Sequence, residues 1–276
     1  MTQISLQDEV LSSNIPVHGP EGFDGMRRAG HLVAECLDML VPEVKVGVST
    51  AHLDDLVRQF VFDNGATPAT LYYRGYRHSS CISLNHVICH GIPGQRILKD
   101  GDILNIDVTL ILDGWHGDHS RMYKAGAPKR KAERLMDVTY ESMMAGIEAV
   151  KPGNRVADIA RAITKVARLN RYSVVKEFCG HGLGRVFHSE PNIVHAWNDQ
   201  ADRYEDSPLL RPGMFFTIEP MLNIGKANAN ILSDGWTAVT KDRQLSAQFE
   251  HSVGVTEDGV EIFTKSPAGL DTPHVL

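Results

Sequence analysis

The sequence predicts an α+β fold made of two similar halves. Apolar residues with helical spacing occur in two pairs of stripes, and strand-like runs follow each pair. A short internal repeat links the pairs, because VKVGVSTAHLDDL from Val44 and VKPGNRVADIARA from Val150 match at five positions with an offset of 106 residues. So few matches also arise by chance. If the duplication is real, two α+β halves face each other across a shared sheet.

The first pair of helices is expected between residues 20 and 65. One apolar stripe ends before Pro42, and a second helix is expected to begin near Ser49 or Thr50 and to stop at Asn64-Gly65. The first stripe consists of Met26, Ala29, Val33, Leu37 and Leu40.

The second pair of helices follows the same plan. One stripe is broken by Pro152-Gly153, and another begins directly after it, so two helices are expected here as well. The stripes are Met136, Tyr140, Met143, Ile147 and Val150, then Val156, Ile159, Ile163, Val166 and Leu169.

Residues 103–123, ILNIDVTLILDGWHGDHSRMY, are predicted to form a β-hairpin. The dipeptide Asp113-Gly114 is a strong signal for a two-residue turn, because both of its central positions need a left-handed backbone. This turn pairs Leu112 with Trp115 and thereby sets the register of the whole hairpin.

The predicted register brings two aspartates together. Asp107 lies opposite Ser120 and Asp118 lies opposite Thr109, so the carboxylates are diagonal neighbours on one face, roughly 7 Å apart at the backbone. Two like charges in an apolar sheet are costly unless a cation lies between them. The hairpin alone fits equally well an exposed ribbon with two solvated aspartates.

Three further residues favour a metal site. Glu219 lies in the apolar run MFFTIEPML and Glu250 lies in LSAQFEHSVGV, so each acid is expected on a strand. His181 lies between glycines in CGHGLG, which let the backbone approach another group closely. Four carboxylates on four strands need a common counter-charge, and one neutral imidazole completes the set.

The ligand types indicate which metals fit. Four carboxylates carry the formal charge that two divalent cations cancel, so two ions are expected. An oxygen-rich site with one imidazole suits manganese, iron or cobalt and also accepts zinc. The four cysteines form no C-x-x-C pair, so neither a zinc knuckle nor a secreted disulfide framework is indicated.

Composition is typical of a globular cytoplasmic enzyme. Of the 276 residues, 42% are hydrophobic and 22% charged, which is enough for a sizeable core. The net charge of −6 and the lack of a basic stripe give no argument for nucleic acid. No apolar run is long enough for a membrane span, and no signal or transit peptide is recognisable. We expect an N-terminal extension at residues 1–19 and one catalytic domain of two repeated halves at residues 20–276.

Five segments, in this order, resemble the bacterial type I methionine aminopeptidases of the peptidase M24, or pita-bread, family. The resemblance runs from about Pro20 to about Lys265. The segments are CISLNHVICHGIP (81–93), NIDVTLILDGWHGDHSRMY (105–123), CGHGLGRVFHSEP (179–191), GMFFTIEPML (213–222) and SAQFEHSV (246–253).

The resemblance implies a fold and an activity. The fold is the pita-bread fold, in which two pseudo-symmetric halves with a curved antiparallel sheet, flanked by helices, surround a dinuclear metal site. The activity is that of a metal-dependent hydrolase that removes the initiator methionine from nascent proteins and peptides when the second residue is small. The implied partners are nascent polypeptide N-termini, including those at the ribosome, with no nucleic acid and no membrane.

The resemblance also implies roles for individual residues. Glu219 would carry a proton to the leaving nitrogen, His188 would donate to the developing oxyanion, and His90 would bond the amide beyond the scissile bond. For each histidine the alternative is an ordinary buried side chain. The implied metal ligands are Asp107, Asp118, His181, Glu219 and Glu250, with Asp118 and Glu250 bridging the two ions.

A pocket for the methionine side chain follows from the same resemblance. A soft, apolar lining suits a thioether, and the family suggests Tyr73, Tyr76, Cys81, Phe187 and Trp236. His116 and His119 flank Asp118, but the family has no ligands at these positions, so we expect them to support the ligands or to lie at the surface.

Two departures from the family pattern are expected at the pocket rim. Arg77 stands where many bacterial members carry proline, and the polar loop 195–208 is a few residues longer than usual.

Other classes on the same fold fit less well. Prolidases and proline aminopeptidases usually carry a large N-terminal domain, whereas about 100 residues precede Asp107. Type II methionine aminopeptidases carry an insertion between the last two glutamates, whereas 31 positions separate Glu219 from Glu250. A non-catalytic scaffold that binds peptides would have lost metal ligands, and this chain retains all five.

Overall fold

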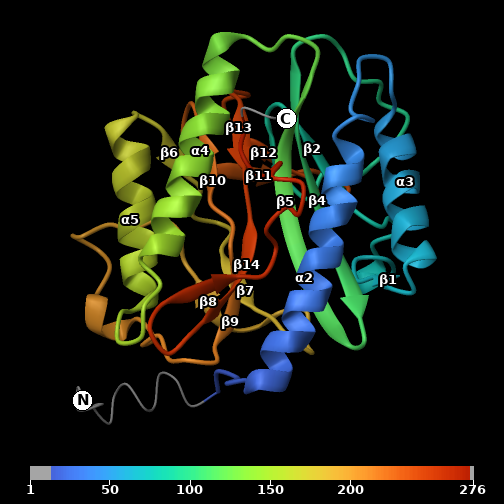
Figure 1. Cartoon of the computed structure of the whole chain (residues 1–276). Helices are drawn as coiled ribbons and strands as arrows, with labels where there is room; N and C mark the ends of the chain where they lie inside the picture. The colour runs from blue at the N-terminus through green and yellow to red at the C-terminus, as the bar shows by residue number, and fades with distance from the viewer. Residues whose placement is uncertain (1–13, 274–276) are drawn as a thin grey trace.

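The computed structural model describes residues 14–273, so most of the predicted extension 1–19 lies outside the described residues. Within this range the α+β class is confirmed, and helices and antiparallel strands occur in two successive series (Figure 1). None of the helices in this range is both long and apolar enough to cross a membrane.

The first series contains two helices and five strands. They are α2 (Pro20–Leu40), α3 (Thr50–Asp63), β1 (Thr67–Pro68), β2 (Cys81–Leu84), β3 (Val87–Cys89), β4 (Asp102–Leu112) and β5 (Trp115–Ala125). A 3-10 turn, η1, covers Tyr73–Gly75 between β1 and β2.

The second series begins with helices α4 (Arg130–Glu148) and α5 (Val156–Leu169). The strands are β6 (Ser173–Val174), β7 (Gly180–Gly182), β8 (Ser189–Ile193), β9 (Phe215–Ile218), β10 (Met221–Asn223), β11 (Ala229–Ile231), β12 (Ala238–Thr240), β13 (Ser246–Gln248), β14 (His251–Val255) and β15 (Val260–Ile262). A second 3-10 turn, η2, covers Tyr204–Asp206.

The end of α2 and the start of α3 lie where the sequence predicts. Pro20 opens α2, where its missing N–H is not needed, and the helix ends at Leu40 before Pro42. Ser49 caps α3, because its hydroxyl accepts a hydrogen bond from the backbone N–H of His52 at 3.2 Å. The apolar stripes of α4 and α5 are buried or partly buried against the strands, except for Leu169 at the end of α5, which is 76% exposed.

The internal repeat has a structural counterpart. Helices α3 and α5 begin 106 residues apart, and the glycines before them, Gly47 and Gly153, have φ angles of 93° and 88°. The N–H of Gly47 donates to the carbonyl of Leu98 at 2.9 Å, and the N–H of Gly153 donates to the carbonyl of Leu210 at 3.1 Å. Equivalent turns therefore introduce equivalent helices in the two halves.

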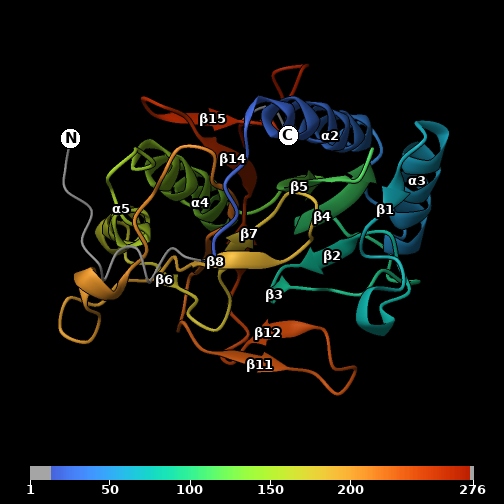
Figure 2. The same cartoon turned by 90° about the horizontal axis from the view of Figure 1, so that it is seen from below.

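Strands β2, β4, β7 and β8 lie between helix α2 on one side and the β11–β12 hairpin on the other (Figure 2). All pairings are antiparallel and form four small sheets, of which the largest orders β15-β14-β9-β7-β8. One apolar cluster packs α2 and α3 on β4 and β5, and another packs α4 and α5 on β9, β10, β13 and β14. The functional side chains lie between these two cores.

The β4–β5 hairpin confirms the predicted register in full. Leu112 pairs with Trp115, Asp107 with Ser120, and Thr109 with Asp118. The turn residues Asp113 and Gly114 have φ angles of 51° and 79°, as a two-residue hairpin turn of this type requires.

The strand prediction is wrong in detail for two acids. Glu219 follows the last residue of β9, and Glu250 lies between β13 and β14. The β9–β10 segment and the β13–β14 segment both pass from one sheet to another at this point, because β9 pairs with β14 whereas β10 pairs with β13. Pro220 contributes to the break, since it has no N–H to donate to a ladder. The pairs Ile218–His251 and Met221–Gln248 flank the break in one continuous register, which places Glu219 opposite Glu250.

Gly117 gives a test of the close contact between β5 and α2. A Cβ atom at this position would lie 2.2 Å from the backbone oxygen of Ala29 in α2. Gly117→Ala is therefore expected to lower the free energy of unfolding by about 1–3 kcal/mol, measured by urea denaturation, because the helix must shift. Gly259→Ala is the control, because nothing lies within 4 Å of its Cβ, and it should be near neutral. Equal stability of the two variants would show that α2 is free to move away from β5.

Candidate metal centre

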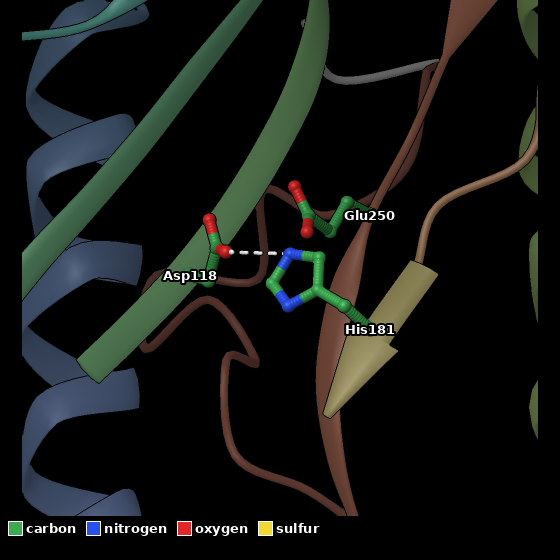
Figure 3. A group of neighbouring side chains, drawn as sticks. All are labelled: Asp118, His181 and Glu250. Atoms are coloured by element: carbon green, nitrogen blue, oxygen red, sulfur yellow. Dashed lines mark ion pairs between the residues drawn. The ribbon is translucent and has the colours of Figure 1, made fainter. Parts of the chain in front are cut away.

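Three potential ligands from different segments converge between the two halves. One ligand atom each of Asp118, His181 and Glu250 lies within 4.8 Å of the other two (Figure 3). His181 Nε2 lies 3.5 Å from Asp118 Oδ2 and 3.7 Å from Glu219 Oε1. Figure 3 shows Asp118 on β5 and His181 on β7 pointing toward each other, with Glu250 beside them.

All twelve predicted site residues line one cavity of about 540 Å³. The remaining two predicted ligands, Asp107 and Glu219, are part of the same wall as the three-residue cluster. The cavity therefore lies where the acids of β4 and β5 meet those of the β9 and β14 segments. The twelve residues are Tyr73, Tyr76, Cys81, His90, Asp107, Asp118, His181, Phe187, His188, Glu219, Trp236 and Glu250.

The carboxylates resist ionisation when no cation compensates them. Burial raises the pKa of Asp118 to about 6. Burial, and next the charge of Asp118, raise the pKa of Asp107, Glu219 and Glu250 well above the usual range. Burial also lowers the pKa of His181 to about 4, so this imidazole is neutral and able to donate a lone pair. A buried cluster of acids beside a neutral imidazole fits divalent cations, which supply the missing positive charge.

Hydrogen bonds orient the acids in the cavity. Thr109 Oγ1 donates to Asp118 Oδ1 at 2.7 Å. Glu219 is held at both oxygens, by Thr217 Oγ1 at 2.8 Å and by Gln248 Nε2 at 3.1 Å. These three supporting residues were not predicted, although strand alternation contains a signal for them. Thr217 and Gln248 each precede an acid by two positions, and Thr109 is the cross-strand partner of Asp118.

The two additional histidines face the same cavity. His188 Nδ1 lies 3.0 Å from the hydroxyl of Tyr73, and its ring centroid lies 4.2 Å from that of His181. Burial, and next the charge of His181, lower the pKa of His188 to about 3. His90 packs edge-on against Phe178 with a centroid distance of 5.4 Å, and burial lowers its pKa. Both imidazoles are therefore neutral hydrogen-bonding groups near pH 7.

Aromatic and sulfur side chains form another part of the wall, and polar residues such as Thr70, Glu177 and Asn192 also line it. The rings of Tyr76 and Trp236 lie 5.0 Å apart, as do those of Tyr73 and Phe187. Sequence reasoning missed Phe178, Cys179 and Met221, which also line the cavity.

The flanking histidines are buried rather than at the surface. His116 Nδ1 lies 2.9 Å from the carbonyl of Gly184, and its ring stacks on Phe187. His119 is 1% exposed, and its Nδ1 contacts the carbonyl of Glu250. The sequence predicts that these histidines either support the ligands or lie at the surface, and the position of His119 fits support of a ligand.

The expected effects of Arg77 and the loop 195–208 on the pocket rim are not found. Arg77 is exposed, and neither it nor any residue of this loop lines the cavity. The loop packs on α5 instead, where the Arg161 guanidinium lies 4.7 Å from the Trp197 ring and 4.6 Å from the Tyr204 ring. Only His195 reaches the site region, by accepting a hydrogen bond from the backbone N–H of Glu219 at 3.1 Å.

Sequence comparison connects this site to characterised proteins. The pattern of metallopeptidase family M24 matches residues 24–257. A methionine aminopeptidase of Rickettsia prowazekii is 51% identical over 261 residues, which cover 94% of this chain and 98% of that protein. A methionine aminopeptidase of Escherichia coli is 49% identical over 252 residues, which cover 91% of this chain and 94% of that protein.

Structural comparison agrees with the sequence. The crystal structure of methionine aminopeptidase from Rickettsia prowazekii superimposes with a TM-score of 0.87 at 50% identity, covering 91% of this chain and 99% of that chain. A prolidase from Pyrococcus furiosus gives a TM-score of 0.74 at 20% identity, covering 94% of this chain and 68% of that one, and so shares the fold. The pita-bread fold is confirmed.

Replacing one acid tests whether charge repulsion is balanced by metal. Asp118 raises the pKa of the other three acids, so Asp118→Asn should stabilise the metal-free protein, raising Tm by about 2–4 °C for each kcal/mol of relieved repulsion. The same change removes a potential ligand, so the rise in Tm on adding Mn²⁺ should largely disappear. Thermal unfolding in EDTA and in Mn²⁺ measures both effects. A metal-dependent shift equal to that of the unaltered protein would exclude Asp118 as a ligand.

Proposed function

Since this chain belongs to metallopeptidase family M24, we infer that the cavity around Asp118, His181 and Glu250 is its active site. The chain is a metal-dependent aminopeptidase that removes the N-terminal methionine. The observation that carries the assignment of the site is the convergence of four buried acids and one neutral imidazole on a cavity with an aromatic wall.

The proposed metal ligands are the five residues expected from the sequence. Two divalent ions fit the four carboxylates, with manganese, iron, cobalt and zinc all compatible with the donor set. Such ions, when bound, supply Lewis-acid activation of water and of the scissile carbonyl. Asp118, His181 and Glu250 would hold the ions together with Asp107 and Glu219, which line the same cavity.

The chain's own residues provide proton transfer and oxyanion stabilisation. Glu219 has a raised pKa and is oriented at both oxygens, which suits a group that accepts a proton and returns it to the leaving nitrogen. His188 is neutral and lies on the cavity wall, where its N–H donates to the oxygen that becomes negative. His90 hydrogen-bonds the amide beyond the scissile bond.

The pocket selects methionine by shape and softness. The ring pairs Tyr76–Trp236 and Tyr73–Phe187 line the cavity together with Cys81, so an unbranched thioether meets aromatic side chains and a thiol. The second residue of the substrate passes between His90 and the rim, and we propose that it must be small.

The setting of the reaction is part of the same proposal. The substrates are nascent polypeptide N-termini, met at the ribosome and in the cytoplasm. Residues 20–276 act as one catalytic domain of two repeated halves, with residues 1–19 as an extension. The rival is a peptide-binding scaffold without activity, and metal analysis together with an assay on a Met-Ala-Ser peptide separates the two.

His188→Ala tests the oxyanion role. The variant should keep its metals and lose kcat by about 10²- to 10³-fold, the usual cost of one oxyanion donor. Metal content by elemental analysis and steady-state kinetics on the same peptide give the two readouts. A variant that lost metal in proportion to activity would recast His188 as a ligand.

Substrate preference tests the pocket. Peptides starting Met-Gly, Met-Ala, Met-Ser or Met-Pro should be cleaved much faster than those starting Met-Lys, Met-Leu or Met-Phe, because bulky second residues meet the rim. Leading residues other than Met should be poor substrates. Comparison of kcat/KM across the series measures this, and equal release of Leu, Lys and Met would show that the pocket is assigned wrongly even if every ligand is right.

A further inference from the structure

Two of the proposed ligands, Asp118 and Glu250, are tied to each other through their main chains. The backbone N–H of Glu250 donates to the carbonyl of Ser120 in β5 at 3.1 Å, and the imidazole of His119 in β5 contacts the carbonyl of Glu250. In the reverse direction, Ser252 Oγ of β14 donates to the carbonyl of Asp118 at 2.6 Å. His119, which follows Asp118, therefore contacts the backbone of Glu250. Ser252, two positions after Glu250, holds the backbone of Asp118.

His119 is restricted to one tautomer in this arrangement. Arg121 Nε donates to His119 Nε2 at 3.0 Å, and a guanidinium has no acceptor, so Nε2 must carry the lone pair. The ring proton therefore lies on Nδ1, which donates to the carbonyl of Glu250.

Arg121 is itself fixed by two partly buried acids. Its guanidinium forms an ion pair with Asp38 of α2 and lies 3.4 Å from Asp271 near the end of the described chain. Arg121 is 0% exposed, so these two carboxylates balance its buried positive charge. The His119 ring also stacks on His251 with a centroid distance of 4.7 Å. The orientation of His119 is thus determined from three sides.

We propose that His119 is a positioning residue, oriented by Arg121, that fixes the Glu250 main chain so that its carboxylate is placed where it would hold divalent cations. Ser252 performs the reciprocal task for Asp118. Glu250 lies in the break between β13 and β14, where no ladder on the β9 side holds it, so its position depends on these contacts from β5. The inference rests on the proposed function, because it assumes that Glu250 is a ligand.

Two amide substitutions separate this role from simple packing. The amide nitrogen of His119→Asn takes the place of Nδ1 and keeps a donor for the Glu250 carbonyl. His119→Gln places its amide near the Nε2 position, beside Arg121 and away from that carbonyl. Both variants are polar and similar in size, so they differ chiefly in the contact to Glu250. Tyr123→Phe is the matched control, because it removes another buried hydrogen bond between β5 and α2, donated by the Tyr123 hydroxyl to the Leu37 carbonyl at 2.7 Å.

The experiment titrates Mn²⁺ into each metal-free protein by calorimetry. We expect His119→Gln to bind Mn²⁺ about 10- to 100-fold more weakly than the unaltered protein, the usual cost of losing a group that orients a ligand. His119→Asn and Tyr123→Phe should stay close to the unaltered protein, and Ser252→Ala should weaken binding as His119→Gln does. Excess Mn²⁺ should restore kcat of His119→Gln on Met-Ala-Ser, which a purely structural defect would not allow.

The outcomes are distinguishable. If the unaltered protein binds Mn²⁺ and His119→Gln binds it equally tightly, or if His119→Asn is as weak as His119→Gln, the positioning role is wrong while the proposed function stands. If the unaltered protein takes up no divalent metal, both fail together. Thermal unfolding in EDTA confirms that each variant is folded before titration.

Discussion

The structure depends on holding four like charges together out of water. Burial raises the pKa of all four acids, Asp107, Asp118, Glu219 and Glu250, and the charge of Asp118 is the next cause for the other three. A flexible chain would separate such groups and hydrate them. Antiparallel ladders on each side of the site prevent this, and hydrogen bonds from Thr109, Thr217 and Gln248 limit the side chains further. Bound cations then compensate the repulsion between the acids that the sheets hold close together.

The two halves share this task equally. The first half places Asp107 and Asp118 on adjacent strands as diagonal neighbours, and the second places Glu219 directly opposite Glu250. In the second half the strands change sheets at this point, so longer glutamate side chains reach in from a break where the first half uses aspartates on continuous strands. The bridge between Ser120 and Glu250 joins the halves at the site.

The sequence predicts most of the parts that depend on local chemistry. The β4–β5 register follows from Asp113-Gly114, because the turn and the two-residue strand period leave one choice. The helix ends follow from Pro42, Ser49 and Pro152-Gly153 for similar reasons.

What the sequence does not predict depends on distant contacts. The break at Glu250 is invisible in LSAQFEHSVGV, because it arises where β13 and β14 pair with different strands. The support that His119 gives to Glu250 links residues 131 positions apart, and no local pattern encodes it. The loop 195–208 was placed at the rim from its length alone, whereas Trp197 and Tyr204 fix it on α5 through Arg161.

The acids are arranged symmetrically, so the direction of the reaction must come from the other groups. His181 and His188 both belong to the second half, whereas Tyr73, which contacts His188 Nδ1, belongs to the first. A neutral imidazole has one N–H, so if His188 donates from Nε2 to the oxyanion, Nδ1 must accept a hydrogen bond from the Tyr73 hydroxyl. The position of Tyr73 is compatible with this tautomer. The second half thus supplies the proposed donor and the first half its hydrogen-bond partner, which requires both halves to be in contact before the site can act.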